Sequence, residues 1–308
     1  MATTVVAPVS NSIALASKYL PLLDEVYKKE ACSAILDTPA ARVNWVGANA
    51  VNIMKLSAVG LGAYSRNAGY VPGDTTGAWE THTIAVDRGR SYQIDYLDNE
   101  ESLGLVVGNL LGEVERVNII PELDAYRFAK LAGTSNIDGT TGAIVVGTTD
   151  VPALIAAAEA SMDDNEVPSE GRILFVSPTC YNALKAKIER RFINSESNVN
   201  YAVEYFDDMR IIRVPQPRFN TAITLATPSA HDGAGGYTAT GENINFMIVH
   251  PSAVLQVMKH YSPRLFTPEQ NIEADAFRLN VRYCGDTFVL ANKVKGIYLH
   301  AEAAATTE

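Results

Sequence analysis

The sequence predicts a mixed fold of helices and strands, either α/β or α+β, from which one long limb projects. Two observations predict it. Strand-like and helical runs alternate between residues 150 and 250. Residues 64–101 form a two-armed loop with a glycine-rich tip that leads into a long helix. A compact enzyme rarely devotes about fifty residues to a projecting arm, so the limb indicates a protein that holds its neighbours.

Composition and charge exclude several classes of protein. The 308 residues are 47% hydrophobic, which is enough for a sizeable core. The net charge of −10 argues against dedicated nucleic-acid binding, which normally shows as a basic patch. No apolar run is long enough for a membrane span, and the N-terminus lacks the features of a signal peptide. Three distant cysteines are expected to be free, buried thiols in a reducing compartment.

The N-terminal region predicts a helical arm over residues 12–36, which ends at residues 37–39. Its apolar side chains recur at helical spacing: Leu15, Tyr19, Leu22, Leu23 and Val26. Two interpretations stay open for it. It is either an ordinary packed helix or an extended arm that lies on another subunit.

The next region predicts a long hairpin. Residues 43–64 and 82–96 have the character of strands, and the glycines and proline of residues 65–79 mark turns between them. Arms of this length would project roughly 40–50 Å. Because an isolated two-stranded hairpin is marginal in water, this one needs a surface to lie on, and a neighbouring subunit is the obvious candidate.

A helix of about thirty residues follows the hairpin. Asp98 is expected to cap it, with Glu101 completing a capping box, and Gly133 is expected to end it. Pro121 falls inside this span and removes one backbone hydrogen bond. The sequence therefore predicts either a kink at Pro121 or two helices that meet there.

The rest of the chain mixes strands and helices. Asp150 precedes a helix to about residue 164, and a second helix runs from residue 178 to about 192. Residues 133–149 are expected to form a loop or a small hairpin, and loops are expected at 194–205 and 227–243. Strands are expected at residues 173–176, 209–215, 246–249, 254–261, 277–283, 288–290 and 296–300.

No motif for enzymatic chemistry is present. The sequence has no phosphate-binding glycine motif, no metal-ligand spacing among its histidines and cysteines, and no nucleophile elbow. The paired carboxylates at 100–101 and 163–164 are best explained as charges at helix ends. We therefore predict no catalytic residue, no cofactor, no metal site and no enzyme.

Several segments together resemble a known family, the major capsid proteins of tailed bacteriophages and prophages, which have the HK97-like fold. The segments lie in the family's order: 47–55, 60–66, 79–81, 87–89, 95–101, 121–128, 214–215, 218–219 and 292–298. The resemblance covers nearly the whole chain. It rests on the ordered set, since no single motif is decisive.

The resemblance implies an α+β fold with the parts of an HK97-like capsid subunit. Residues 1–44 would be the N-terminal arm and residues 45–97 the extended E-loop. Residues 98–147 would belong to the peripheral domain with its spine helix, and residues 148–250 mostly to the axial domain. Residues 251–308 would return through the strands of the peripheral domain and finish in the axial domain.

The function implied by the resemblance is structural. Copies would assemble as hexamers and pentamers into an icosahedral virion capsid around packaged double-stranded DNA, in the cytoplasm of the host bacterium. The partners implied are further copies of the chain, scaffolding, portal and decoration proteins, and nonspecifically contacted DNA, with no membrane. Some members begin with a scaffolding region of roughly a hundred residues; here a separate scaffolding protein, or the arm itself, is expected to perform that task.

The projecting limb contains candidate intersubunit residues. Arg88 and Arg90 lie at its stem with only Asp87 beside them, and their guanidinium groups suit carboxylates on a partner. Tyr70 and Trp79 are expected at the tip, where a monomer would expose them, and Arg66 lies there too. The alternative is that the arginines are ordinary solvated surface groups, each worth ~0–1 kcal/mol.

We predict that the subunits are not covalently cross-linked. Some members of the family join subunits through a Lys–Asn isopeptide bond whose lysine lies in the E-loop. No lysine occurs between Lys55 and Lys130 of this chain. Particles boiled in denaturant are therefore expected to run as single chains on a gel, and a ladder of covalent multimers would contradict this.

Two rival functions remain at the level of sequence. One is a nanocompartment shell of the encapsulin type, which has the same fold and encloses enzymes in place of DNA. The other is a soluble α/β enzyme, which would be a stable monomer with a substrate pocket. The size and contents of the particle distinguish all three functions.

Overall fold

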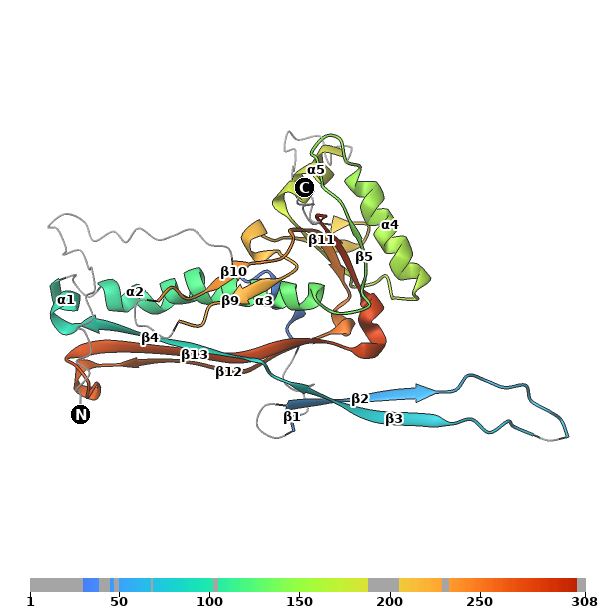
Figure 1. The fold of residues 1–308 in the computed structure, drawn as a ribbon, viewed down its shortest axis with the longest axis horizontal. Helices are drawn as coiled ribbons and strands as arrows, with labels where there is room; N and C mark the ends of the chain where they lie inside the picture. The colour runs from blue at the N-terminus through green and yellow to red at the C-terminus, as the bar shows by residue number, and fades with distance from the viewer. Residues whose placement is uncertain are drawn as a thin grey trace, which may run out of the picture.

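The computed structural model describes residues 30–38, 45–46, 50–67, 69–101, 105–187, 205–228 and 233–303. These residues form three parts: an upright mixed sheet, a flat sheet beside a long helix, and a hairpin that projects to one side (Figure 1). The arm predicted at residues 12–36 falls mostly outside the described residues. Its described end contains the short 3-10 helix η1 (Ser33–Leu36).

The upright sheet has six strands in the order β5-β14-β11-β6-β8-β7. Its strands are β5 (Asp138–Thr141), β6 (Ile173–Val176), β7 (Tyr205–Phe206), β8 (Met209–Arg213), β11 (Ile244–Val249) and β14 (Ile297–Ala301). Two neighbouring pairs, β5 with β14 and β6 with β8, are parallel. Every residue of β6 and β11 is buried, so both faces of the central strands are covered.

Alternate residues of the central strands pack into two different cores. Leu174 and Phe246 face the helices α4 (Val151–Asp164) and α5 (Pro178–Lys187). Phe175 faces the opposite way, towards helix α3 (Ile120–Ala132). There the ring of Phe128 meets the rings of Phe175 and Phe219 edge-on, with centroids 5.1 Å apart in both pairs. Helix α3 is therefore fixed against the sheet by aromatic packing.

The flat sheet consists of β12 (Val254–Phe266), β13 (Ala276–Val289) and β4 (Val86–Asp95), all antiparallel. Leu279 and Val281 of β13 pack against Val114 on the helix above them. The strands predicted at 277–283 and 288–290 are thus one strand. Gly285 and Asp286, which lie between the two predicted strands, pair within the sheet as well.

The long helix is built from four segments: α1 (Tyr96–Glu101), α2 (Leu105–Val114), the π-helix η3 (Glu115–Ile119) and α3. The predicted cap at Asp98 is three residues late, because Asp95 accepts the Leu97 N–H at 2.9 Å and the helix begins at Tyr96. Pro121 has no N–H to donate to the preceding turn, and a wide π-turn lies just before it. The predicted end is confirmed, since Gly133 caps α3.

The projecting hairpin differs from its predicted form. Its strands are β2 (Ala50–Ala58) and β3 (Thr75–Thr83), with β1 (Trp45–Val46) paired to the base of β2. The predicted second arm, 82–96, is mostly β4, which pairs with β13 in the flat sheet. The predicted arm at 82–96 therefore belongs to the hairpin only as far as Thr83. Both β3 and β4 have an extended sequence, and alternation alone does not say which partner a strand takes.

The region predicted as a loop or small hairpin at 133–149 and the loop predicted at 227–243 both contain strands. Residues 133–149 include β5, and residues 227–243 include β10 (Tyr237–Ala239), which pairs with β9 (Ile223–Leu225). These strands are only three or four residues long, too short for a periodic pattern. The helix after Asp150 and the strands at 173–176, 209–215 and 246–249 are confirmed. The remaining described elements are four short helices: η4 (Gln216–Arg218), η5 (Pro251–Ala253), η6 (Pro268–Gln270) and η7 (Ala291–Gly296).

Glu159 of α4 makes the stability of the upright domain depend on pH. Burial raises the pKa of Glu159 to about 7, and the nearby carboxylate of Asp207 adds to the shift. Because the folded state favours the protonated form, stability falls as the pH rises from the unfolded pKa, about 4.5, to about 7. Glu159→Gln is expected to melt like the wild type at pH 4.5 and at a higher temperature at pH 8. Equal melting temperatures at both pH values would contradict this.

Candidate functional site

The projecting hairpin is an amphipathic two-stranded ribbon. Residues that pair directly across an antiparallel ladder point to the same face. Met54 pairs with Trp79, and Leu56 with Gly77. The opposite face carries the pairs Ile53 with Glu80, Lys55 with Ala78 and Ser57 with Thr76, each of which has at least one polar or charged side chain. One face is therefore apolar and the other mostly polar.

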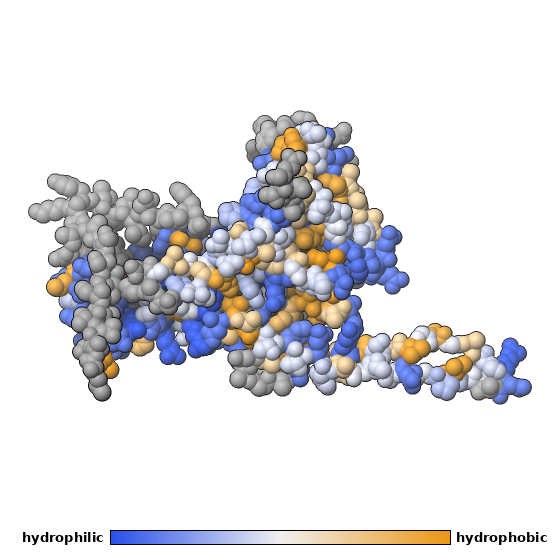
Figure 2. All heavy atoms as spheres, in the orientation of Figure 1, coloured by the Kyte–Doolittle hydropathy of each residue, from blue (hydrophilic) through white to orange (hydrophobic). Residues whose placement is uncertain are grey.

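The apolar face has no partner among the described residues of its own chain. Met54, Leu56 and Trp79 are 56%, 63% and 61% exposed. Figure 2 shows hydrophobic side chains along this limb, outside the body of the molecule. Gly77 has a specific role here, because the methyl carbon of Met54 lies 3.2 Å from where a Cβ would stand. A side chain at residue 77 would shift the methyl group of Met54 by a few tenths of an ångström, so the glycine allows Met54 to lie close over β3.

The tip of the hairpin is a small closed turn. Ser65 and Gly69 exchange two backbone hydrogen bonds of 3.2 and 2.8 Å, and Gly69 has a φ of +78°. The rings of Tyr64 and Tyr70 meet edge-on at 5.0 Å just below the turn. Tyr70 is 89% exposed, and Arg66 lies exposed within the turn. The tip thus presents two aromatic rings and one cation in a defined arrangement.

The base of the hairpin is buried against the body of the molecule, whereas its tip is exposed. Val51 is 1% exposed, and the ring of His82 lies 4.9 Å from that of Phe288 on β13. Ile84, between β3 and β4, packs with Val257 and Phe288. The hairpin therefore leaves the body of the molecule beyond Val51, from a rigid apolar base.

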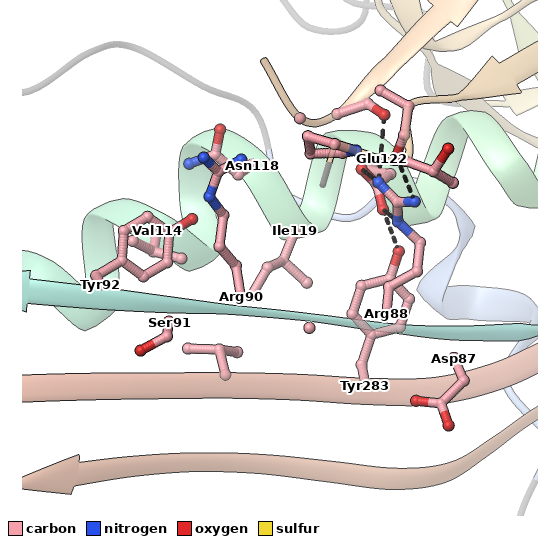
Figure 3. Close-up of a pocket in the computed structure, with 17 residues that line it drawn as sticks. Asp87, Arg88, Arg90, Ser91, Tyr92, Val114, Asn118, Ile119, Glu122 and Tyr283 are labelled. Atoms are coloured by element: carbon pink, nitrogen blue, oxygen red, sulfur yellow. Dashed lines mark hydrogen bonds and ion pairs between the residues drawn. The ribbon is translucent and has the colours of Figure 1, made fainter. Parts of the chain in front are cut away.

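Arg88 on β4 is engaged within its own chain. Its guanidinium grips Glu122 of α3 through Nε–Oε1 and Nη2–Oε2 contacts of 2.5 and 3.0 Å. It also donates to the carbonyl oxygens of Ala226 and Gly236, at 2.8 and 3.3 Å. The Tyr283 hydroxyl donates to Glu122 Oε1 at 2.5 Å. Burial, reinforced by Glu122, raises the pKa of the Tyr283 phenol. Figure 3 shows the group from β4, β13 and α3.

This group lies in a cavity of about 500 Å³ between β4, the π-helix and the β9–β10 hairpin. Arg90 enters the same cavity two residues further along β4 and donates to the Gly233 carbonyl oxygen at 3.0 Å. Both arginines therefore hold the β9–β10 hairpin against the long helix. The premise that only Asp87 accompanies them is wrong, because Glu122 is brought in from 34 positions away.

Three of the five predicted contact residues lie on the projecting hairpin, and the other two lie in the cavity. Arg66 and Tyr70 are at the tip as expected. Trp79 is not at the tip but within β3, because Gly77 belongs to a strand rather than a turn. Arg88 and Arg90 line the cavity. The prediction missed Met54 and Leu56, although their even spacing in a strand-like run was a usable signal.

A second buried cluster holds the end of the arm. Asp124 of α3 is fully buried and accepts the backbone N–H groups of Cys32 and Ser33 at 2.9 and 3.1 Å. It also accepts the Ser33 hydroxyl at 2.6 Å and Arg218 Nη1 at 3.1 Å. The neighbouring Arg127 donates to Ser33 and Asp37. One helix thus binds the arm's end through a carboxylate and a guanidinium.

The described residues offer little for other chemistry. They include no group of three or more metal-ligating side chains, and in this part of the chain no helix has the length and apolarity to cross a membrane. The three cysteines are buried free thiols, as predicted. Burial raises the pKa of Cys180 to about 12, which makes it a poor nucleophile.

This arrangement of helices and strands is an α+β fold that matches HK97-like structures of phage capsids over 94% of the chain. The chain matches a structure from Mycobacterium phage Che8 with a TM-score of 0.62 and 15% identity, over 94% of this chain and 98% of that one. It matches the capsid structure of the cyanophage P-SCSP1u with a TM-score of 0.63 and 15% identity, over 94% and 93% of the chains.

A third match is the mature capsid of bacteriophage PhiM1, with a TM-score of 0.62 and 12% identity over 94% and 92% of the chains. No protein-family model and no curated protein matches the sequence. The predicted fold class, α+β with the HK97-like fold, is confirmed.

Proposed function

We propose that this chain is a major capsid protein that self-assembles as hexamers and pentamers into the icosahedral shell of a tailed phage. The observation that carries the proposal is the fold match over nearly the full length of both chains, including chains from a cyanophage capsid and a mature phage capsid. The exposed apolar hairpin supports it independently, because a monomer gains nothing from a bare hydrophobic limb. This role is structural rather than enzymatic.

The parts of the chain are assigned as follows. Residues 1–44 are the N-terminal arm, and the E-loop runs from residue 45 to about 85, shorter than the sequence suggested. The long helix with β4, β12 and β13 is the peripheral domain. The six-stranded sheet with α4 and α5 is the axial domain, which places it at the centres of hexamers and pentamers. This division follows the two sheets and their separate cores.

The E-loop would contact the neighbouring subunit through its apolar face and tip. Met54, Leu56 and Trp79 supply the hydrophobic area, and Tyr70 and Arg66 supply the aromatic and charged ends. Aromatic residues and arginine carry a disproportionate share of interface energy. Arg88 is reassigned to an intramolecular role, since all three nitrogens of its guanidinium have partners in its own chain.

The other partners follow from the same role. Scaffolding, portal and decoration proteins would act on the shell, and packaged double-stranded DNA would contact its inside without sequence preference. A net charge of −10 fits a container whose DNA contacts are nonspecific and weak. The assembled chain would then be found in the virion.

Sedimentation and negative-stain imaging of the purified, full-length chain test the proposal. Closed shells, tubes or sheets of capsomers in the megadalton range are expected. A stable monomer of 33.2 kDa at high concentration, with or without a scaffolding protein, would refute it. The contents of native particles distinguish a phage capsid, which holds DNA, from a nanocompartment, which holds protein.

A further inference from the structure

One buried carboxylate lies where the projecting hairpin joins the body of the molecule. Asp286 on β13 is 4% exposed. Its Oδ2 accepts the backbone N–H of Ala85 at 2.9 Å. Its Oδ1 accepts the Tyr126 hydroxyl of α3 and the N–H of Thr287, both at 2.8 Å. The carboxylate therefore joins the hairpin root to the long helix and to the flat sheet.

Ala85 is the point at which the chain changes partners. Up to Thr83 the chain pairs with β2, and from Val86 it pairs with β13, where the first pair is Val86 with Gly285. Ala85 belongs to neither ladder. The residue after Gly285 in β13 is Asp286. Its side chain accepts the backbone N–H of Ala85, which has no partner in either ladder. The dihedral angles at this junction set the direction in which the hairpin leaves.

The sheet is irregular at the same place. The pairing of β12 with β13 shifts register between Met258 and His260, opposite Gly285. A Cβ on Gly285 would stand 2.7 Å from the carbonyl oxygen of Val257, so the two strands approach closely here. Such bulges bend and twist a strand locally. The bulge lies in β12, directly beside the part of β13 that carries Asp286.

We propose that Asp286 is a positioning residue that fixes the angle of the projecting hairpin relative to the long helix. Hydrophobic packing of Ile84 alone would hold the root but not its direction, because apolar contacts are not directional. Hydrogen bonds to a buried, three-way acceptor are directional. The consequence for assembly rests on the proposed function: the angle would decide where the limb meets the next subunit.

Tyr126 links Asp286 to the long helix. Burial, followed by the charge of Asp286 and their hydrogen bond, raises the pKa of the phenol, so it stays a donor at any physiological pH. Its neighbour Arg127 binds Ser33 and Asp37 at the end of the arm. The neighbouring residues Tyr126 and Arg127 of α3 therefore contact Asp286 at the base of the hairpin and the end of the N-terminal arm, respectively.

The test is a distance measurement on the unassembled chain. The three native cysteines are buried, so spin labels would attach to cysteines introduced at the exposed positions Thr76 on β3 and Ala156 on α4. The wild-type background is expected to give one narrow distance distribution. Asp286→Ala is expected to give a distribution about twofold wider, because the root loses its directional contacts.

The control is Asp87→Ala, which removes an exposed carboxylate that pairs with the exposed Arg282 of β13. It is expected to leave the distribution unchanged. If Asp286→Ala does not fold, Tyr126→Phe replaces it; this variant keeps the Ala85 contact, frees the carboxylate from α3 and is expected to broaden the distribution less.

A distribution as narrow as that of the wild type in the folded variant overturns the proposal. A chain that never forms shells overturns the proposed function instead, because the distance measurement does not depend on assembly. With assembly established, Asp286→Ala is expected to give particles of irregular size and curvature.

Discussion

Trp79→Ser is expected to abolish assembly while leaving the fold of the chain intact. The indole is 61% exposed and pairs with Met54 on the bare face of the hairpin, so its removal costs the monomer at most the ~0.2–1 kcal/mol of one cross-strand pair. At an interface, a buried aromatic anchor is worth about 2 kcal/mol or more, roughly thirtyfold in affinity for each contact. In the proposed shell every subunit would make this contact, so the loss would be repeated throughout it.

The matched control is Lys55→Ser, next to Met54 but on the opposite face of the same strand. It is expected to assemble normally. Sedimentation of both variants at equal concentration measures the effect, and circular dichroism with thermal melting checks the fold. If Trp79→Ser formed shells at the wild-type concentration, the apolar face would not be the contact surface.

Asp124→Ala is expected to give the largest loss of stability of any single substitution at the arm's end. Asp124 is fully buried and neutralises Arg218, whose side chain is 4% exposed. Removing one member of a buried ion pair leaves the other charge uncompensated, which typically costs about 3–5 kcal/mol. The two N–H groups of Cys32 and Ser33 also lose their acceptor. The urea midpoint of the unassembled chain measures the loss.

The control for Asp124 is Glu273→Ala. Glu273 also pairs with an arginine, Arg278, but its side chain is 71% exposed. Its loss is expected to cost about 0–1 kcal/mol. Adding Arg218→Met to Asp124→Ala should recover part of the lost free energy of unfolding, because it removes the buried positive charge that Asp124 neutralises. If the urea midpoint of Asp124→Ala were close to that of Glu273→Ala, the prediction would be contradicted. Water would then solvate the groups that Asp124 contacts in the folded state.

The parts of the fold with strong local signals could be predicted from sequence. The helix after Asp150, the end of the long helix at Gly133 and the apolar strand at 173–176 each carry their own periodicity or capping residue. The partner of a strand carries no such signal. Alternation at 86–95 correctly indicated a strand, but its pairing with β13 depends on residues almost two hundred positions later.

The same limit applied to the site. Arg88 looked unpaired because sequence shows only near neighbours, and Glu122 reaches it through folding of α3 over β4. Trp79 was placed at a tip because Gly77 normally marks a turn; here the glycine makes room for Met54. The burial of Asp124 was unpredictable for a similar reason, since its donors come from residues 32–33 and 218.

The direct continuation of β3 into β4 has a mechanical consequence (Figure 1). Tension applied to the tip of the hairpin runs lengthwise into β4, whose ten residues pair with β13 from Val86–Gly285 to Asp95–Ala276. Ladder hydrogen bonds lie perpendicular to the strands, so this load shears all the pairs together and does not peel them off one at a time. The limb would therefore be stiff under tension while remaining easy to bend sideways, a combination that would suit the proposed shell if it is pressed from within.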